Sequence, residues 1–506
     1  MPQDSPIDSQ DLSTKRRPKP ERGDRLELTT DSLAFEGKAV ARREDGYVIF
    51  VDGAIAGERI IAEIKKAKGS FAKAKVTEIL EAGPERRTPI CPYFGICGGC
   101  ALQHLTYEAQ LRWKKQQVID LFERVGKIAN PPVRNIIPAE SEYYYRNKME
   151  FSFSDERWLT EEEIASGDVQ DRFALGLHVR ERFDRVIDTN VCFLPNRHVT
   201  DILNFTREFA ILNKLGVYSN RQDRRGSQSE QHPPSTLLDS VEDGFLRFLV
   251  IKTSHATGET MVNLVTSREE PDILVAFTRE LVQSIPQVTT VVNNINSKRS
   301  QVAVGEYEII YHGDGTIRDS IGRATYRISA NSFFQANTPQ AERLYEIAAN
   351  FAELKPTDEL WDLYCGTGTI SLFVANRVKH VLGVELVESA IADARSNAEA
   401  NGVQNVDFIA SDLRHALTRP DFLSEHSKPN VLIIDPPRSG MHPDVIREVL
   451  KLHPERIAYI SCNPATQARD IALLLEGYEL LELQPVDMFP QTYHIECVAK
   501  LHRKDN

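Results

Sequence analysis

Cys462 is the residue of this chain whose chemistry is most informative. It lies in Ile460-Ser-Cys-Asn-Pro464, at the end of an apolar run that is typical of a buried strand. A free cysteine is more often an apolar core residue, but the Asn-Pro that follows places this thiol at the end of the strand. A thiolate is a strong nucleophile once its surroundings lower its pKa. The position therefore favours covalent catalysis by Cys462.

A glycine-containing loop, Asp362-Leu-Tyr-Cys-Gly-Thr-Gly-Thr369, follows one predicted strand and begins a predicted helix. Gly366 and Gly368 allow the backbone to approach a ligand closely, and Glu385 ends the next strand, where an acid can bind ribose hydroxyls. A dinucleotide site would carry a third glycine where Ser371 stands. Because S-adenosylmethionine has no pyrophosphate, it does not need that glycine. The pattern favours S-adenosylmethionine over a dinucleotide or a purely structural turn.

Three acidic positions accompany this loop. Asp435-Pro-Pro-Arg438 ends the fourth predicted strand, and ligands of such sheets bind outside the carboxyl ends of the strands. Arg438 stands where enzymes that methylate amines carry an aromatic residue, which disfavours an amino-group acceptor. The alternative to a ligand-binding role for this segment is a rigid turn.

Asp412 ends the third strand and either reaches the adenine of the cofactor or is a plain loop acid. Glu496 lies in a crowded polar and aromatic stretch, although an acid in an edge strand is most simply a solvent-facing residue.

The chain has seven cysteines, and in a cytosolic protein they are not expected to form disulfides. Cys91, Cys97 and Cys100 are spaced as Cys-x5-Cys-x2-Cys, with Gly98-Gly99 between the last two. Cys192 is the next cysteine along the chain. Four thiolates suit either zinc or a [4Fe–4S] cluster. Zinc sites usually consist of two close pairs, so three cysteines plus a distant one favour iron–sulfur. The remaining cysteines are interpreted as structural: Cys365 and Cys497.

The elements that hold the C-terminal motifs begin near residue 338. Thr338 fits a helix N-cap with Pro339 in the first turn, and this helix should run to about Phe351. Strands and helices then alternate at a spacing typical of a mostly parallel, doubly wound sheet. Two later strands should pair as an antiparallel edge, about 480–486 and 494–500. The earlier strands are predicted near 360–363, 380–384, 406–410, 431–434 and 457–461.

The rest of the chain has a different pattern. Residues 23–83 show short alternating runs separated by Asp-Gly turns, which predict a small β-barrel. Its stretch 65–75 has five lysines and no acid, which fits either nucleic-acid binding or a solvated face. The polar, proline-containing composition of residues 1–22 predicts a disordered N-terminal segment. The central region, 84–330, contains strand-like runs and a predicted disordered insertion at 219–235.

Composition sets wider limits. A chain of 506 residues should hold about three domains, and 41% hydrophobic and 26% charged residues are ordinary for a soluble protein with a real core. The net charge of −12 argues mildly against nucleic-acid binding, but a whole-chain charge says little about a local groove. No apolar run approaches the roughly 20 residues that cross a bilayer. We expect a cytoplasmic protein without membrane contact.

Together these motifs resemble the RNA uracil-C5 methyltransferases that use S-adenosylmethionine, over nearly the whole chain from about residue 23. The resemblance implies an α/β protein with a Rossmann-like methyltransferase domain (331–506), an N-terminal TRAM or OB-like β-barrel (23–83) and a central α+β domain for RNA and iron–sulfur binding (84–330). It implies that Cys462 adds to C6 of uracil and that Glu496 removes the C5 proton. The implied cofactor-binding residues are Gln335 of Asn331-Ser-Phe-Phe-Gln335, Tyr364, Glu385 and Asp435.

The resemblance also bears on the substrate. Cys91, Cys97, Cys100 and Cys192 match the [4Fe–4S] ligands of the branch that modifies 23S ribosomal RNA. A uridine of 23S ribosomal RNA is therefore the implied target of a monomeric enzyme. A transfer-RNA uridine is the alternative within the same chemistry, and a non-catalytic RNA-binding assembly factor is the alternative in another class. Intact Cys462 and Glu496 argue against the latter.

Overall fold

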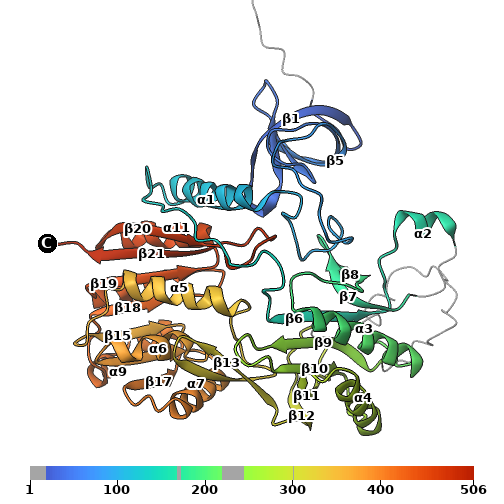
Figure 1. Cartoon of the computed structure of the whole chain (residues 1–506). Coiled ribbons are helices and arrows are strands. Elements are labelled where there is room, and N and C mark those ends of the chain that lie inside the picture. The colour runs from blue at the N-terminus through green and yellow to red at the C-terminus, as the bar shows by residue number, and fades with distance from the viewer. Residues whose placement is uncertain (1–18, 168–171, 219–243, 300, 506) are drawn as a thin grey trace, which may run out of the picture. The chain divides into compact units, whose positions relative to one another are not determined.

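The computed structural model describes residues 19–167, 172–218, 244–299 and 301–505. Residues 1–18 of the predicted N-terminal segment and the whole predicted insertion, 219–235, lie outside the described residues. The chain divides into two compact units, one formed by Met1–Thr88 with His104–Thr106 and the other by Pro89–Gln103 with Tyr107–Asn506. Each unit is described separately below (Figure 1).

The first unit is a closed five-stranded barrel of order β1-β2-β3-β5-β4. Alternate residues of β3 and β4 point inward, so Ile49, Val51 and Ile60 form a fully buried core. The predicted barrel is confirmed. Its elements are β1 Arg25–Leu33, η1 Phe35–Gly37, β2 Ala39–Arg42, β3 Val48–Asp52, β4 Arg59–Ala67 and β5 Phe71–Glu81.

The second unit begins with α1 (Tyr107–Arg124) and a seven-stranded sheet of order β12-β11-β10-β9-β6-β7-β8. Helices α3 and α4 pack on one face of this sheet, where Leu203 and Phe277 meet Phe151 and Leu249 (Figure 1). Its strands are β6 Lys148–Ser154, β7 Ala174–Val179, β8 Arg182–Asp188, β9 Leu246–Thr253, β10 Thr260–Thr266, β11 Val288–Ile295 and β12 Tyr307–His312. Its helices are α2 Glu161–Ser166, α3 Arg197–Leu212 and α4 Pro271–Ser284.

A hairpin, β13 (Thr316–Ile321) and β14 (Ala324–Ser329), leads to a second seven-stranded sheet of order β17-β16-β15-β18-β19-β21-β20. Strands β15 to β19 are parallel, and β21 is antiparallel to both of its neighbours. The strands are β15 Glu359–Leu363, β16 His380–Glu385, β17 Val406–Ala410, β18 Val431–Ile434, β19 Arg456–Ser461, β20 Tyr478–Val486 and β21 Glu496–Arg503. The predicted doubly wound sheet is confirmed.

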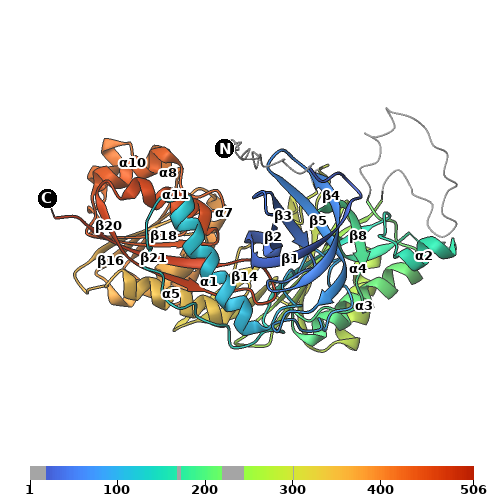
Figure 2. The same ribbon diagram turned by 90° about the horizontal axis from the view of Figure 1, so that it is seen from above.

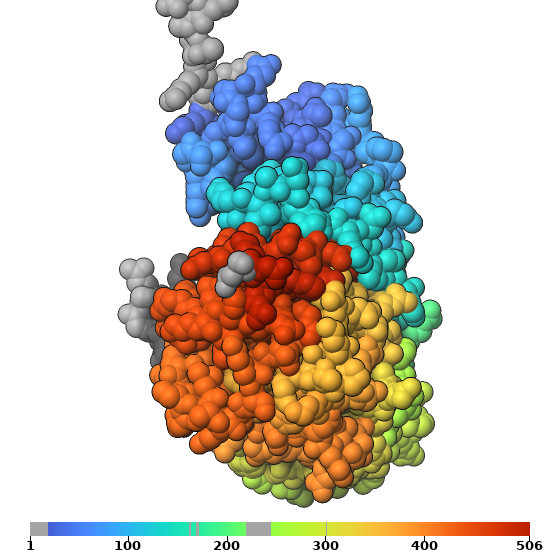
Figure 3. Space-filling view, turned by 90° about the vertical axis from the view of Figure 1, so that its left-hand side faces the viewer, coloured from blue at the N-terminus to red at the C-terminus, as the bar shows by residue number. Residues whose placement is uncertain are grey.

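Two apolar layers cover the faces of this sheet. One contains α5, α6 and α7, and the other contains α10, α11 and, from far earlier in the chain, Val118 and Phe122 of α1. Figure 2 shows α1 beside the C-terminal strands, and in Figure 3 the region of the chain around α1 (cyan) lies against the C-terminal residues (red). The helices are α5 Thr338–Phe351, α6 Thr369–Val374, η3 Ala375–Arg377, α7 Glu388–Ala400, α8 Leu413–Ala416, α9 Pro420–Glu425, α10 Pro443–Leu452 and α11 Pro464–Leu474.

One sequence-based detail is wrong, and another is confirmed. The N-cap of α5 is Asn337, whose side chain accepts a hydrogen bond from the Gln340 N–H, and Thr338 is already helical. The two predicted later strands do pair as the antiparallel edge of the sheet: β20 is outermost, and β21 lies inside it, between β19 and β20. Most of its residues are buried, as an interior strand requires.

Candidate active site

Most of the predicted site residues meet at one edge of the second sheet. The parallel strands β15, β16, β18 and β19 end at this edge, and they are followed or ended by Tyr364, Glu385, Asp435 and Cys462. Ligands of doubly wound sheets bind outside these carboxyl ends. Each of the four side chains is half-buried, so each keeps some surface for a ligand.

Glu496 reaches the same edge from the opposite chain direction. It is the first residue of β21, which is antiparallel to β19 with Ser461 paired to Cys497. One step beyond that pair, Cys462 leaves β19 where Glu496 enters β21. The register therefore brings the thiol and the carboxyl together, although 33 residues separate them in the sequence.

The glycine-containing loop has the backbone conformation that its residues predict. Gly366 and Gly368 have φ values of 54° and 75°, in the left-handed region that favours glycine. Glu385 accepts hydrogen bonds from the backbone N–H groups of Gly366 at 3.2 Å, Leu386 at 2.8 Å and Val387 at 3.0 Å. These bonds fix the Glu385 carboxylate at the mouth of the loop.

The segment Asn331–Gln335 lies against the same loop. The Thr367 hydroxyl donates to the Phe333 carbonyl at 3.3 Å, and the Gln335 side chain is hydrogen-bonded to the Tyr345 hydroxyl. Tyr345 in turn contacts the Thr369 hydroxyl at 2.9 Å. Tyr364 is therefore part of this loop, Gln335 and Glu385 lie against it, and the Asp435 N–H donates to the Leu363 carbonyl within it at 3.2 Å. The exposed ring of Phe333 lies beside the loop.

The environment of Cys462 determines its reactivity. Burial, and then the neighbouring Glu496 and Asp435, raise the pKa of the Cys462 thiol to about 11. Burial, and then Asp435, raise the pKa of Glu496 well above its usual range. Burial, followed by Asp362, raises the pKa of Asp435 to about 7. At neutral pH the Cys462 thiol therefore holds its proton in the substrate-free protein, and burial disfavours the ionised form of Glu496.

Sequence reasoning gave no catalytic role to two residues that the structure brings to this site. Arg438 is hydrogen-bonded to Cys462, and its charge lowers the pKa of both Cys462 and Glu496. It also donates to Nδ1 of His494 at 3.2 Å. Burial, and then Arg438, lower the pKa of His494 to about 4, so its imidazole is neutral. The unusual arginine of Asp435-Pro-Pro-Arg438 was the available signal.

Comparisons with known proteins agree with this geometry. The family profile described as tRNA (Uracil-5-)-methyltransferase matches residues 254–504, and the TRAM domain profile matches residues 19–77. An uncharacterized RNA methyltransferase of Chlorobaculum tepidum is 39% identical over 506 residues, covering 99% of this chain and 100% of the relative. A second, from Porphyromonas gingivalis, is 40% identical over 94% of this chain and 99% of its own.

The chain belongs to the RNA uracil-C5 methyltransferase family. It is an S-adenosylmethionine-dependent enzyme that acts on RNA. The crystal structure of a Pyrococcus abyssi tRNA (uracil-54, C5)-methyltransferase with S-adenosyl-L-homocysteine is similar, with a TM-score of 0.69 and 26% identity. The match covers 94% of this chain and 99% of the other.

The four N-terminal and central cysteines of this methyltransferase are close enough to influence one another. Burial, and then the charges of other cysteines of this set, raise the pKa values of Cys97 and Cys192, and none of the four is in a disulfide. Within the described ranges, however, no group of three or more His, Cys, Asp or Glu side chains is arranged to hold a metal ion. The predicted metal ligands are Cys91, Cys97, Cys100 and Cys192.

The structure also bears on membrane contact. Across the part of the methyltransferase that the structure describes, no helix combines the length and apolar character that spanning a bilayer requires.

Proposed function

We propose that this enzyme methylates C5 of a uridine in 23S ribosomal RNA through a covalent bond between Cys462 and C6 of uracil. The observation that carries the proposal is the β19–β21 register, which supports a nucleophile at Cys462 facing a proton acceptor at Glu496. S-adenosylmethionine, the second substrate, supplies an electrophilic methyl group on a positively charged sulfur. We assign its binding to Gln335, Tyr364, Glu385 and Asp435.

The chemistry of uracil explains why a thiol is needed. C5 of uracil is a weak nucleophile. Once the Cys462 thiol has released its proton to solvent, the thiolate adds to C6, which breaks the C5–C6 double bond and gives an enolate with negative charge at C5. C5 then forms its bond to the methyl group while the sulfonium–methyl bond breaks. Glu496 takes the proton from C5, the double bond re-forms, and Cys462 leaves as a thiolate. Arg438 stabilises this thiolate at the start and at the end.

RNA that contains 5-fluorouracil tests the covalent step. Fluorine at C5 prevents proton removal, so the adduct should persist and survive denaturation. Cys462→Ala should form no adduct, whereas Cys497→Ala, which removes a neighbouring thiol that is fully buried in the sheet, should retain it. An undiminished adduct in Cys462→Ala would refute the assignment.

We further propose that Cys91, Cys97, Cys100 and Cys192 bind a [4Fe–4S] cluster. Four free, mutually interacting thiols with raised pKa values suit this role, because a bound metal would stabilise the thiolates that burial disfavours. The reaction needs no redox step, so the cluster would be structural. Anaerobic purification followed by iron, sulfide and zinc analysis tests this, and stoichiometric zinc without iron would contradict it.

The choice of RNA has one serious alternative. The four-cysteine pattern resembles the ribosomal-RNA branch, whereas the similar solved enzyme acts on uracil-54 of transfer RNA. Mapping 5-methyluridine in both RNA classes, from cells with and without the gene, separates the two. Loss confined to transfer RNA would replace the ribosomal target and leave the chemistry intact.

A further inference from the structure

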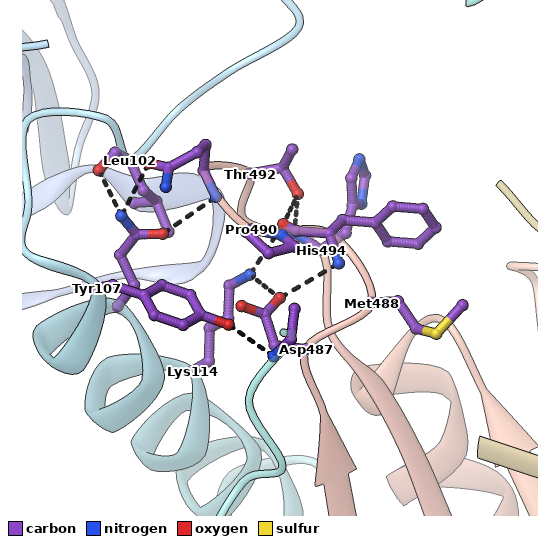
Figure 4. A network of polar contacts seen from close by, with 12 residues as sticks. Leu102, Tyr107, Lys114, Asp487, Met488, Pro490, Thr492 and His494 are labelled. Carbon is purple, nitrogen blue, oxygen red and sulfur yellow. Dashed lines mark hydrogen bonds and ion pairs between the residues drawn. The ribbon is translucent and has the colours of Figure 1, made fainter. Parts of the chain in front are cut away.

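The segment between β20 and β21, residues 487–495, carries His494 and leads directly into Glu496. It has no regular secondary structure, yet it is largely inaccessible to solvent: Asp487, Met488 and Gln491 are fully buried. Figure 4 shows that its polar groups are held by residues from early in the chain, among them Lys114 of α1. We call residues 487–495 the base segment.

Lys114 makes the first connection. Its Nζ lies 2.7 Å from Oδ1 of Asp487 and donates to the Phe489 carbonyl at 3.1 Å. The two side chains are 1% and 0% exposed, so the ion pair is completely buried. Asp487 Oδ1 also accepts the Phe489 N–H at 3.2 Å, which closes the turn at the start of the base segment. Removing one charge alone would leave the other buried without a partner.

Gln491 makes the second connection, in a strained conformation. Its φ of 69° lies in the left-handed region, which is unfavourable for a residue other than glycine. Gln110 of α1 exchanges two hydrogen bonds with it, from Nε2 to the Gln491 Oε1 at 3.0 Å and from the Gln491 N–H to Oε1 at 3.1 Å. The N–H groups of Ala101 and Leu102 both donate to the Gln491 carbonyl at 2.9 Å.

The buried face of α1 is unusual for a helix that packs against a sheet. Gln110, Lys114 and Gln117 are buried at spacings of four and three residues, on one side of the helix, where apolar side chains are expected. Burying polar groups is costly unless they are paired, and residues that break the local pattern in this way concentrate at functional sites. The partners of Gln110 and Lys114 lie in the base segment.

We propose that Lys114 and Gln110 are positioning residues for the removal of the C5 proton. The inference rests on the proposed function, because it takes Glu496 as the base. After methyl transfer, C5 carries both a hydrogen and a methyl group, and the RNA stays bound to Cys462 until Glu496 takes that hydrogen. Lys114 and Gln110 fix residues 487–491 of the segment that leads into Glu496. A displacement of about 1 Å at the base is enough to slow such a transfer severely.

Single-turnover experiments with unmodified uridine RNA test the proposal. In a single turnover, Lys114→Met and Gln110→Leu should accumulate a methylated, denaturation-resistant RNA–protein adduct. In steady-state turnover, both variants should lower kcat by about tenfold or more. The KM values for RNA and S-adenosylmethionine should change much less. Replacing the C5 hydrogen by deuterium should slow the variants more than the wild type, because proton removal becomes rate-limiting. Lys115→Met, the adjacent lysine, which is bonded to Asn135, is the matched control.

A variant with both charges removed guards against a trivial folding defect. Lys114→Met/Asp487→Asn leaves no unpaired buried charge, so its thermal midpoint should lie close to that of the wild type. It still lacks the bond to the Phe489 carbonyl, so adduct accumulation and the larger isotope effect should persist. If this variant instead turns over with a wild-type isotope effect and no adduct, Lys114 is only structural.

Glu496→Gln separates this inference from the proposed function. If Glu496→Gln accumulates the methylated adduct and the α1 variants do not, the positioning role is wrong and the base assignment stands. If Glu496→Gln accumulates none, the base assignment itself fails.

Discussion

Replacing Arg438 by glutamine should slow the formation of the adduct between Cys462 and 5-fluorouracil RNA about tenfold at neutral pH. The thiol already has a raised pKa of about 11, and Arg438 is the cation that opposes burial, Glu496 and Asp435. A hydrogen bond to a charged group is worth about 1.5–3 kcal/mol. Arg438 is exposed to solvent, so the lower end applies, and about 1.4 kcal/mol corresponds to tenfold less thiolate.

The measurement is the rate of adduct formation between pH 7 and 9 at saturating RNA. Below the pKa of Cys462, the wild-type rate should rise about tenfold per pH unit, because the thiolate fraction does. The Arg438→Gln profile should have the same slope and lie about one pH unit higher. Arg447→Gln, which removes an exposed arginine paired with Asp444 on α10, is the control.

Superimposable profiles for wild type and Arg438→Gln would refute the electrostatic reasoning. A uniform loss of RNA affinity without a shift along the pH axis would also refute it, since Arg438 would then act on RNA binding rather than on the thiol.

Three other outcomes are expected. Burial raises the pKa of Asp362 from 3.8 to about 7, so the stability that this group contributes is present at acid pH and is lost as the pH rises through about 7. The thermal midpoint of Asp362→Asn should therefore exceed that of the wild type by more at pH 8 than at pH 5. Equal differences at the two pH values would contradict this. The proposed nucleophile Cys462 and the proposed base Glu496 both act in their ionised forms, and both have raised pKa values. The rate of methyl transfer in turnover should therefore increase from pH 6 to pH 9. A flat pH profile would argue against these two residues as nucleophile and base. Replacing the exposed Lys66 and Lys75 of the barrel by glutamine should weaken RNA binding. The slope of log affinity against log salt concentration should fall by about one unit for each RNA phosphate that the variant no longer neutralises. An unchanged slope would exclude the two lysines from the RNA interface.

The C-terminal sheet, and the position of the predicted site residues at one edge of it, were predictable because their signals are local. Gly366, Gly368 and the strand ends at Glu385, Asp435 and Cys462 are each recognisable within a few residues of sequence. Residues 480–486 and 494–500 were likewise recognisable as an antiparallel pair. The neighbour of β21 on its other side was not, because β19 is separated from β21 in the sequence by α11 and β20. Its pairing with β19 is decided by burial of both faces of the strand in the complete sheet.

The roles of α1 and Arg438 were not predictable from sequence for a different reason. Gln110 and Lys114 look like ordinary solvent-facing positions of a helix, and their partners lie more than 370 residues away. Arg438 looks like a substitution in a known turn until His494 and Cys462 are seen beside it. The four cysteines are the reverse case, since their sequence pattern is clear and their described arrangement forms no metal site.

The position of β21 has a consequence for when this enzyme becomes active during its synthesis. Strand β21 follows β20 in the sequence but lies between β19 and β20 in the sheet. While the ribosome holds residues 496–503, β19 and β20 have no strand between them, and Cys462 has no carboxyl opposite it. The barrel belongs to a compact unit of its own and is synthesised long before this strand. With Glu496 as the proposed base, proton removal has to wait until the strand that carries this residue has emerged and been inserted.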